Sequence, residues 1–344
     1  MLPDENPGFD FDAAVTSPFR MQPGLRRMAP GNAHLTPSQP GSRHLREKLA
    51  VLSAFWPSAL CAVSGFDAGP ALAALCAQAA AEHPQAFSWD GDCARALNLG
   101  AAAWRSGRVE QAELGRFGLG DEIARCLRLL PEPWRLAGLV SLAFIEDFAV
   151  VDAVSGTVPW LAVALPSHWA PESKLGRHFA EVHAPVADGD LLRKAGASLM
   201  QLVTRSEPGE RWERFVWNVT DQPRLNAHPA VAGGPRWQQT SVAESWFRTE
   251  RQTFIPLPDA QAVFTIAVDV QRLDEVLSRK CGFATFLDPC GGRQPQGAGL
   301  RAPGTDSRAA ALRAAVASMS PAVLAYRGLT PVRDDLLAWL ETLA

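Results

Sequence analysis

The chain changes character near residue 145, and this change limits the folds that it can adopt. Before this point, alanine-rich stretches at 70–82 and 93–105 favour helices, because alanine has the highest intrinsic helix propensity. After it, short segments rich in valine and aromatic residues are separated by turn signals, which is typical of strands. We therefore predict an α+β protein with a mainly antiparallel sheet, preceded by an α-rich N-terminal region.

Individual elements follow from periodicity and turn chemistry. The segment 148–151 and the segment 160–165 flank the turn signal Ser155-Gly156, which predicts an antiparallel hairpin. Apolar spacing and charge distribution predict the remaining elements. We expect further strands at 212–219, 245–255 and 262–268, and further helices at 44–60, 121–130, 188–205, 307–319 and 331–343.

The same patterns suggest how the chain is divided. Residues 1–42 contain many Pro, Gly, Ser and Asn residues with little periodicity, which predicts an extended N-terminal arm. Residues 43–140 are expected to form the α-rich region that packs on the core, and residues 141–344 to form the core itself. Two stretches rich in Pro, Gly and Gln, 222–242 and 279–305, are predicted to be loop insertions within that core.

Charge and hydropathy exclude several classes of protein. The 33 Lys and Arg residues nearly balance the 36 Asp and Glu residues, and no basic run is present, so nucleic acid is not an expected partner. The acidic N-terminus lacks the apolar core of a signal peptide, and no apolar stretch approaches the roughly 20 residues that span a bilayer. We expect a cytoplasmic protein without a membrane partner.

Familiar catalytic and metal-binding motifs are missing from the sequence. The six cysteines are spread along the chain without a Cys-x-x-Cys pair, which favours reduced, mostly buried thiols over a disulfide framework, a zinc site or an iron–sulfur site. Gly115-x-x-Gly118-x-Gly120 has the wrong glycine order for a dinucleotide fingerprint. No Walker loop and no Gly-x-Ser-x-Gly elbow is present.

One segment, residues 166–186, collects histidines among cations and aromatic residues. Haem needs a flat apolar slot, an axial ligand with a lone pair, and cations for its propionates. Neutral imidazole can be that ligand, and Pro185 would stiffen the backbone beside His183. From these residues alone, a structural loop histidine is the more common alternative, and spacing does not choose among His168, His178 and His183.

Two motifs in this part of the chain carry a family resemblance. The run Trp169-x-Pro171-x-x-Lys174-x-Gly176 is followed by Val182-His183-x-Pro185-Val186, and a later strand reads Arg248-Thr249-Glu250-Arg251-Gln252-Thr253. In order and spacing they closely resemble the signatures of the haem-dependent oxidative N-demethylase-like family. Lesser matches are Glu146-Asp147 and Tyr326-Arg327-Gly328, and the resemblance covers roughly residues 10–330.

The resemblance implies a fold, a cofactor and partners. Members of the family are similar to PAS domains, so the core is expected to be PAS-like. The characterised enzyme is a haem-binding subunit that oxidatively removes methyl groups from dimethylamine. Its haem activates dioxygen, and electrons arrive from NADPH through flavin and iron–sulfur components on partner subunits. By resemblance we expect haem b, O₂, a small methylated amine as substrate, and a flavin/iron–sulfur reductase as electron donor.

The resemblance also implies roles for particular residues. His183, the histidine of the His-x-Pro-Val motif, becomes the expected axial ligand of the iron. Lys174 and Arg177 are expected to contact the propionates, and Trp169 and Trp217 to line the cofactor pocket.

The second motif has a physical interpretation as well. In a strand, Arg248, Glu250 and Gln252 project from one face. Facing a haem pocket, Glu250 would bind an ammonium substrate, while Arg248 would fix a carboxylate or polarise bound dioxygen. The alternative is a structural ion pair on a solvated face of the sheet. Tyr326, the only tyrosine, is more often a packing residue than a chemical one.

The sequence departs from the family pattern at two places that bear on function. Val216 stands where relatives commonly have Asn before Trp217, and Ala187 stands where a second Pro is usual. A pocket with a changed polar group would accept a different amine, or none. Two alternatives therefore stay open: a non-catalytic PAS-type protein that senses haem or gas or binds a ligand, and a family member that has lost haem and serves as a scaffold.

Overall fold

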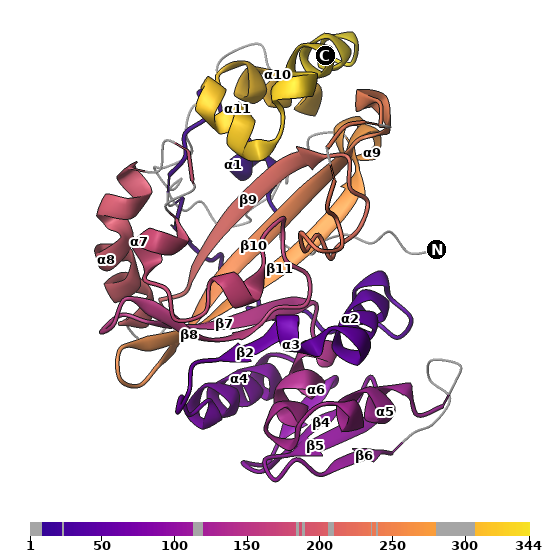
Figure 1. Ribbon diagram of the computed structural model, residues 1–344, viewed down its shortest axis with the longest axis vertical. Coiled ribbons are helices and arrows are strands. Elements are labelled where there is room, and N and C mark those ends of the chain that lie inside the picture. Colours follow the sequence, from indigo (N-terminus) through magenta and orange to yellow (C-terminus); the bar gives the residue numbers. More distant parts are fainter. Residues whose placement is uncertain are drawn as a thin grey trace, which may run out of the picture.

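The structure is a computed structural model that describes residues 9–22, 24–112, 120–183, 186–187, 190–205, 210–234, 236–238, 240–279 and 307–344. Figure 1 shows a large twisted sheet through the middle of the molecule. The C-terminal helices lie at one end of this sheet, and a second, smaller sheet with its helices lies at the other.

The large sheet has seven strands in the order β1-β9-β10-β11-β7-β8-β2, and every neighbouring pair is antiparallel. The predicted hairpin and the three predicted strands after residue 210 are confirmed, and with them the α+β class. The N-terminal arm contributes the edge strand β1, and the predicted α-rich region at 43–140 contributes the other edge strand, β2. The strands are β1 (Arg26–Arg27), β2 (Leu60–Ala62), β7 (Glu146–Asp152), β8 (Thr157–Ala162), β9 (Trp212–Thr220), β10 (Trp246–Leu257) and β11 (Gln261–Arg272).

The smaller sheet corrects one prediction. Its four antiparallel strands occupy much of the stretch expected to be helical at 93–105, so that expectation is wrong and the region before residue 140 is mixed rather than α-rich. Gly100, in the left-handed region at φ 64°, helps the chain reverse between two of the strands. The strands are β3 (Phe87–Trp89), β4 (Cys93–Ala96), β5 (Ala101–Trp104) and β6 (Val109–Gln111).

Packing explains why alanines form strands there. Ala94, Ala96, Ala101 and Ala103 are all buried in the main core, where their small side chains let a helix approach the sheet closely. Burial in tertiary structure overrides an intrinsic preference that is worth less than about 1 kcal/mol per residue.

The predicted helices are otherwise confirmed, although the first ends at Ala54, before Pro57, rather than at residue 60. In the first part of the chain the helices are α1 (Phe11–Ala14), α2 (Arg43–Ala54), α3 (Trp56–Ala59), α4 (Gly69–Glu82), α5 (Glu122–Leu129) and α6 (Arg135–Ala143). The later helices are α7 (Phe179–Val182), α8 (Asp190–Thr204), α9 (Leu273–Ser278), α10 (Arg308–Ala317), α11 (Pro321–Arg327) and α12 (Arg333–Thr342).

The two faces of β9 and β10 have different surroundings. Side chains alternate along a strand, so Trp217, Val219 and Phe247 share one face. They pack with the N-terminal arm and the C-terminal helices in one hydrophobic cluster. Residues 9–15 of the arm therefore lie across the main sheet, with Phe11 buried against Phe247.

A lysine is buried in the core beside the start of β7. Lys48 is fully buried, and its Nζ donates to the backbone carbonyls of Ser141, Phe144 and Glu146 and lies 3.2 Å from Asp147 Oδ1. The carboxylate of Glu146 accepts from the Thr36 amide through Oε2, whereas its Oε1 is buried with no hydrogen-bond partner among the described residues. Burial raises the pKa of Glu146 to about 7.

This carboxyl makes stability depend on pH in a defined direction. The pKa of Glu146 is about 7 in the folded protein and 4.5 ordinarily, so the folded state holds the proton more tightly than the unfolded state. The stabilisation that this proton gives to the folded state is lost as pH rises from 4.5 through 7. In the wild type, the free energy of unfolding is expected to fall by up to about 3 kcal/mol over this pH range, and Glu146→Gln is expected to abolish this fall. Urea unfolding of both proteins at about pH 5 and about pH 8 measures it. Equal pH slopes in the two proteins would contradict the assignment.

The described cysteines match the expectation from their spacing. Cys61, Cys76, Cys93 and Cys126 are buried and free. Cys281 and Cys290 lie outside the described residues. Burial raises the pKa of Cys61 to about 11 and that of Cys76 to about 12, so both thiols stay protonated at neutral pH.

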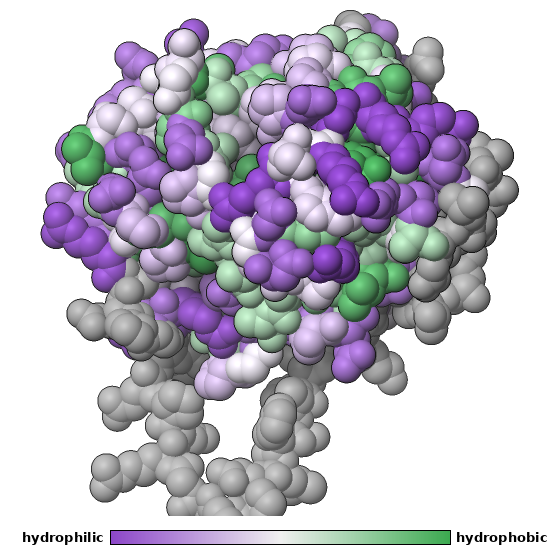
Figure 2. Space-filling view, turned by 90° about the horizontal axis from the view of Figure 1, so that it is seen from below, coloured by the Kyte–Doolittle hydropathy of each residue, from purple (hydrophilic) through white to green (hydrophobic). Residues whose placement is uncertain are grey.

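The described residues contain neither a group that would hold a metal ion nor a single helix that could span a membrane. No single described helix is long and apolar enough to cross a membrane; α10 and α11 meet that test only as a pair, bent by 116°. Nowhere in the described ranges do three or more His, Cys, Asp or Glu side chains form a group that would hold a metal ion. Viewed from the small-sheet end, hydrophilic residues cover much of the surface and hydrophobic residues appear in small, separate areas (Figure 2).

Candidate functional site

The candidate site lies on the face of β9 and β10 that points away from Trp217. Three cross-strand pairs place six side chains on this face: Arg248 opposite Asn218, Glu250 opposite Val216, and Gln252 opposite Arg214. Five of the six are polar, and Arg214, Val216, Asn218 and Glu250 are only partly buried. A sheet face with this composition is suited to holding a polar or charged ligand rather than to packing in a core.

His183 stands at the end of α7, beside this face. Its Nδ1 lies 2.8 Å from the carbonyl oxygen of Phe179, and the two rings are 4.0 Å apart between centroids. A carbonyl can only accept, so Nδ1 carries the proton and Nε2 keeps its lone pair. Burial lowers the pKa of His183 to about 4, and the positive charges of Arg214 and Lys174 act in the same direction. The imidazole is therefore neutral at physiological pH, as an axial ligand must be.

The short helix before His183 is fixed at both ends. At its start, the Ala180 amide donates to His178 Nδ1, and the His178 amide donates to Glu181. At its end, Lys174 Nζ donates to the carbonyl oxygen of Val182, 3.2 Å away. His178 and Lys174 therefore position the histidine ligand candidate. Arg177, the other expected propionate contact, is exposed near this helix.

Arg248 lies on the candidate face, but all three nitrogens of its guanidinium make structural hydrogen bonds. Burial lowers the pKa of Arg248 to about 10, which leaves it charged at neutral pH. The guanidinium ties the segments 165–167 and 224–225 to β10. It donates to Ser167 Oγ at 2.7 Å and to the carbonyl oxygens of Arg224 at 3.0 Å, Leu165 at 3.3 Å, Pro166 at 3.1 Å and Leu225 at 2.7 Å.

Arg214 is a site residue that the motifs did not identify. Its Nε is buried and has no hydrogen-bond partner among the described residues. Burial lowers the pKa of Arg214, while the charge of Glu250 raises it, and Arg214 in turn acts on His183. Strand alternation could have found it, because Arg214 lies two residues before Val216 and so shares its face.

Glu250 occupies the centre of the face. It is half-buried, and one of its carboxylate oxygens accepts a hydrogen bond from Gln252 Nε2 at 2.6 Å. The charge of Glu250 acts on Arg214, Arg248 and Tyr326. Tyr326 reaches this group from α11, with its side chain 48% exposed, so it is not a core packing residue.

The two tryptophans of the predicted pocket lie apart. Trp169 is half-buried and packs beside Leu175 and Phe264, on the same side of the sheet as Glu250. Trp217 lies on the opposite face, where it is stacked on Phe247 and donates from Nε1 to the carbonyl oxygen of Ala14. The structure does not bring Trp217 to the candidate face. Trp217 lies between Val216 and Asn218 in β9, and neighbouring residues of a strand point to opposite sides of the sheet.

Three buried polar atoms on this face, and a fourth on the nearby His168, have no hydrogen-bond partner among the described residues. Buried polar groups are almost always paired, so a cluster of unpaired ones needs a cause. His168 adjoins Ser167, which binds Arg248, and burial lowers the pKa of His168 to about 4. The four atoms are Arg214 Nε, Asn218 Oδ1, Gln252 Oε1 and His168 Nε2.

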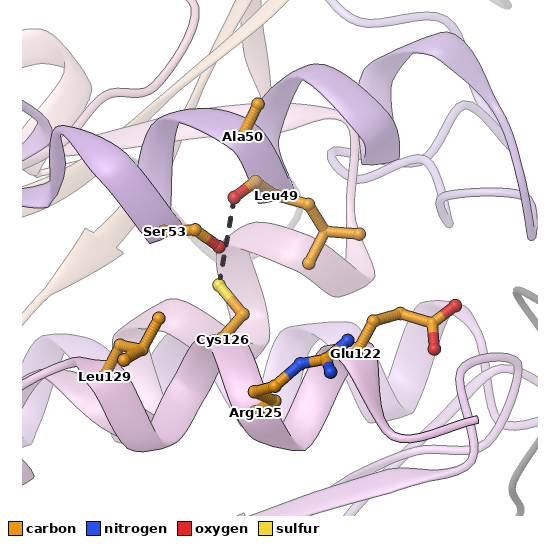
Figure 3. A pocket seen from close by; sticks show the side chains of 7 residues that line it. All are labelled: Leu49, Ala50, Ser53, Glu122, Arg125, Cys126 and Leu129. Carbon is orange, nitrogen blue, oxygen red and sulfur yellow. Dashed lines mark hydrogen bonds between the residues drawn. The ribbon is translucent and has the colours of Figure 1, made fainter. Parts of the chain in front are cut away.

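A hollow of about 340 Å³ lies elsewhere, between α2 and α5. Figure 3 shows Cys126 of α5 pointing toward Leu49 and Ser53 of α2, with its sulfur 4.0 Å from the Leu49 carbonyl oxygen. None of its lining residues is a histidine, and none belongs to the β9–β10 face. This hollow is therefore separate from the candidate site.

Comparison with known families identifies the segment that carries the site. Residues 126–284 match the family model described as haem-dependent oxidative N-demethylase, alpha subunit-like. This segment belongs to that family. The match includes His183, Arg214, Arg248 and Glu250, while Tyr326 lies beyond it. No curated protein matches the chain.

The residues of the demethylase-like segment fit a haem group. The family is haem-dependent, and a neutral histidine whose Nε2 keeps its lone pair lies beside a face whose polar atoms are partly unpaired among the described residues. Lys174 keeps two of its three donor hydrogens beyond the bond to Val182, and Arg177 is exposed next to it. These two cations are suitable for propionates.

Proposed function

We propose that the protein is the haem-binding subunit of an oxidative N-demethylase with a PAS-like core. The observation that carries the proposal is the neutral His183, whose Nε2 keeps its lone pair beside Arg214, on the face that also carries Glu250. In this assignment His183 binds the iron of haem b, Lys174 and Arg177 hold the propionates, and Trp169 packs near the cofactor. The family description supports haem as the cofactor.

The protein's own residues prepare the substrate. Bound haem would supply the activation of dioxygen. Glu250 binds the protonated secondary amine through its carboxylate and accepts the ammonium proton, which exposes the nitrogen lone pair. Arg248 acts as a positioning residue through the segments that it ties to β10. The balanced reaction is R₂N–CH₃ + O₂ + 2e⁻ + 2H⁺ → R₂NH + HCHO + H₂O.

A partner must supply the two electrons. The sequence contains neither a dinucleotide fingerprint nor a flavin or iron–sulfur motif, and the family is described as alpha subunit-like, which implies a partner subunit. We propose a flavin/iron–sulfur reductase as this partner and a small methylated amine as the substrate.

Turnover by the haem-loaded protein tests this function. With a reductant, oxygen and a panel of N-methylamines, we expect formaldehyde and the demethylated amine in equal amounts. Glu250→Gln is expected to lower the rate by about 100-fold or more, because it removes the base and the counter-charge together. Haem uptake without formaldehyde from any amine in the panel would overturn the proposal and favour a haem or gas sensor.

A further inference from the structure

Arg214 and Glu250 face each other diagonally but do not form an ion pair. Glu250 is opposite Val216, and Arg214 lies two residues before Val216, so the two charged side chains are diagonal neighbours on one face. The charge of Glu250 acts on Arg214, yet the ion pairs of the described residues include no contact within 4 Å between the two side chains. The buried Nε of Arg214 has no hydrogen-bond partner within the described ranges.

The opposite face of the same two strands provides an internal comparison. Arg251 is opposite Phe215, and Glu213 lies two residues before Phe215, which is the same diagonal relation. There the two charges meet directly, with Arg251 Nε 2.9 Å from Glu213 Oε2. The backbone geometry of β9 and β10 therefore permits an ion pair at this diagonal position. The strand geometry is thus not what keeps Arg214 and Glu250 apart on the candidate face.

We propose that Arg214 and Glu250 bind a zwitterionic substrate between them, namely an N-methylated α-amino acid. Its carboxylate accepts hydrogen bonds from Arg214, and its ammonium donates to Glu250. Val216 lies between the two charged residues along this face and gives the methyl group an apolar contact. The inference rests on the proposed demethylase function for the methyl group, and it names the class of amine.

Charge excludes the two other ligands that this face would meet. A simple cation such as dimethylamine would neutralise Glu250 but would add a second positive charge beside Arg214, whose Nε has no partner among the residues that the structure describes. A haem propionate on Arg214 would bring a carboxylate next to Glu250, with the same unfavourable result. A zwitterion satisfies both charges at once.

Binding titrations of the full-length protein test the charged pair without turnover. The probes are N-methylglycine, dimethylamine (no carboxylate) and acetate (no ammonium), measured by calorimetry with wild type, Arg214→Met and Arg128→Met. Arg128 is an exposed cation on α5 and serves as the matched control. We expect Arg214→Met to weaken N-methylglycine binding by about 10- to 100-fold and to leave dimethylamine binding unweakened or tighter, because the like charge is gone, while Arg128→Met changes neither.

The outcomes separate this inference from the proposed function. Selective binding of N-methylglycine that disappears in Arg214→Met supports the zwitterion site, even if no formaldehyde is formed. Dimethylamine that binds wild type as tightly as N-methylglycine would overturn it. An Arg214→Met protein that loses its haem would overturn it as well, because Arg214 would then hold a propionate.

Discussion

Replacing Arg248 by methionine is expected to lower the free energy of unfolding by about 3–5 kcal/mol. The guanidinium supplies hydrogen bonds to Ser167 and to four backbone carbonyls of the segments 165–167 and 224–225, all at 3.3 Å or less. Methionine would leave these acceptors unpaired in a buried place, and each unpaired group costs about 1–3 kcal/mol. Urea unfolding followed by tryptophan fluorescence measures the loss.

Arg214→Met provides a matched comparison on the same face of the sheet. Because Arg214 Nε has no hydrogen-bond partner in the part of the chain that the structure describes, removing its charge is expected to change the free energy of unfolding by less than about 1 kcal/mol. A large loss in both variants would mean that Arg214 is also structural, and a small loss in both would contradict the role assigned to Arg248. The comparison thus distinguishes Arg248, which stabilises the fold, from Arg214, which is available to bind a ligand.

The sequence predicted the large sheet well because its strands carry a strong local signal. Apolar alternation and turn residues mark the hairpin near Ser155-Gly156 and the three strands after residue 210, and all of them form. The signal failed at residues 93–105, where helix propensity was the only local information. Ala94 and Ala103 are opposite each other in adjacent strands and fully buried, and this packing is a tertiary effect that composition does not contain.

The candidate site was predicted unevenly for a related reason. Period-two alternation correctly placed Arg248 and Glu250 on one face, but it did not reveal that backbone carbonyls from two distant loops surround Arg248. The same alternation puts Trp217 on the opposite face, although the motif suggested a place near the cofactor. Tyr326 joins Glu250 only through the packing of α11, about 75 residues later in the chain, so no local pattern predicts it.

Haem ligation by His183 is the second large effect that we expect. The carbonyl of Phe179 holds the Nδ1 proton, and burial lowers the pKa of His183 to about 4, so a neutral Nε2 is available for iron. His168 is the matched alternative, because it is also largely buried and neutral, and its Nε2 has no hydrogen-bond partner among the described residues. Both residues lie in the segment that resembles the haem-binding motif.

The Soret spectrum of the haem-reconstituted protein tests the central claim most directly. Wild type and His168→Ala are expected to show a strong Soret band that shifts when CO is added to the reduced protein. His183→Ala is expected to bind haem at least about tenfold more weakly and to recover a ligated spectrum when imidazole is added. A wild-type protein without a Soret band, or a His183→Ala spectrum identical to wild type while His168→Ala loses the band, would contradict the account.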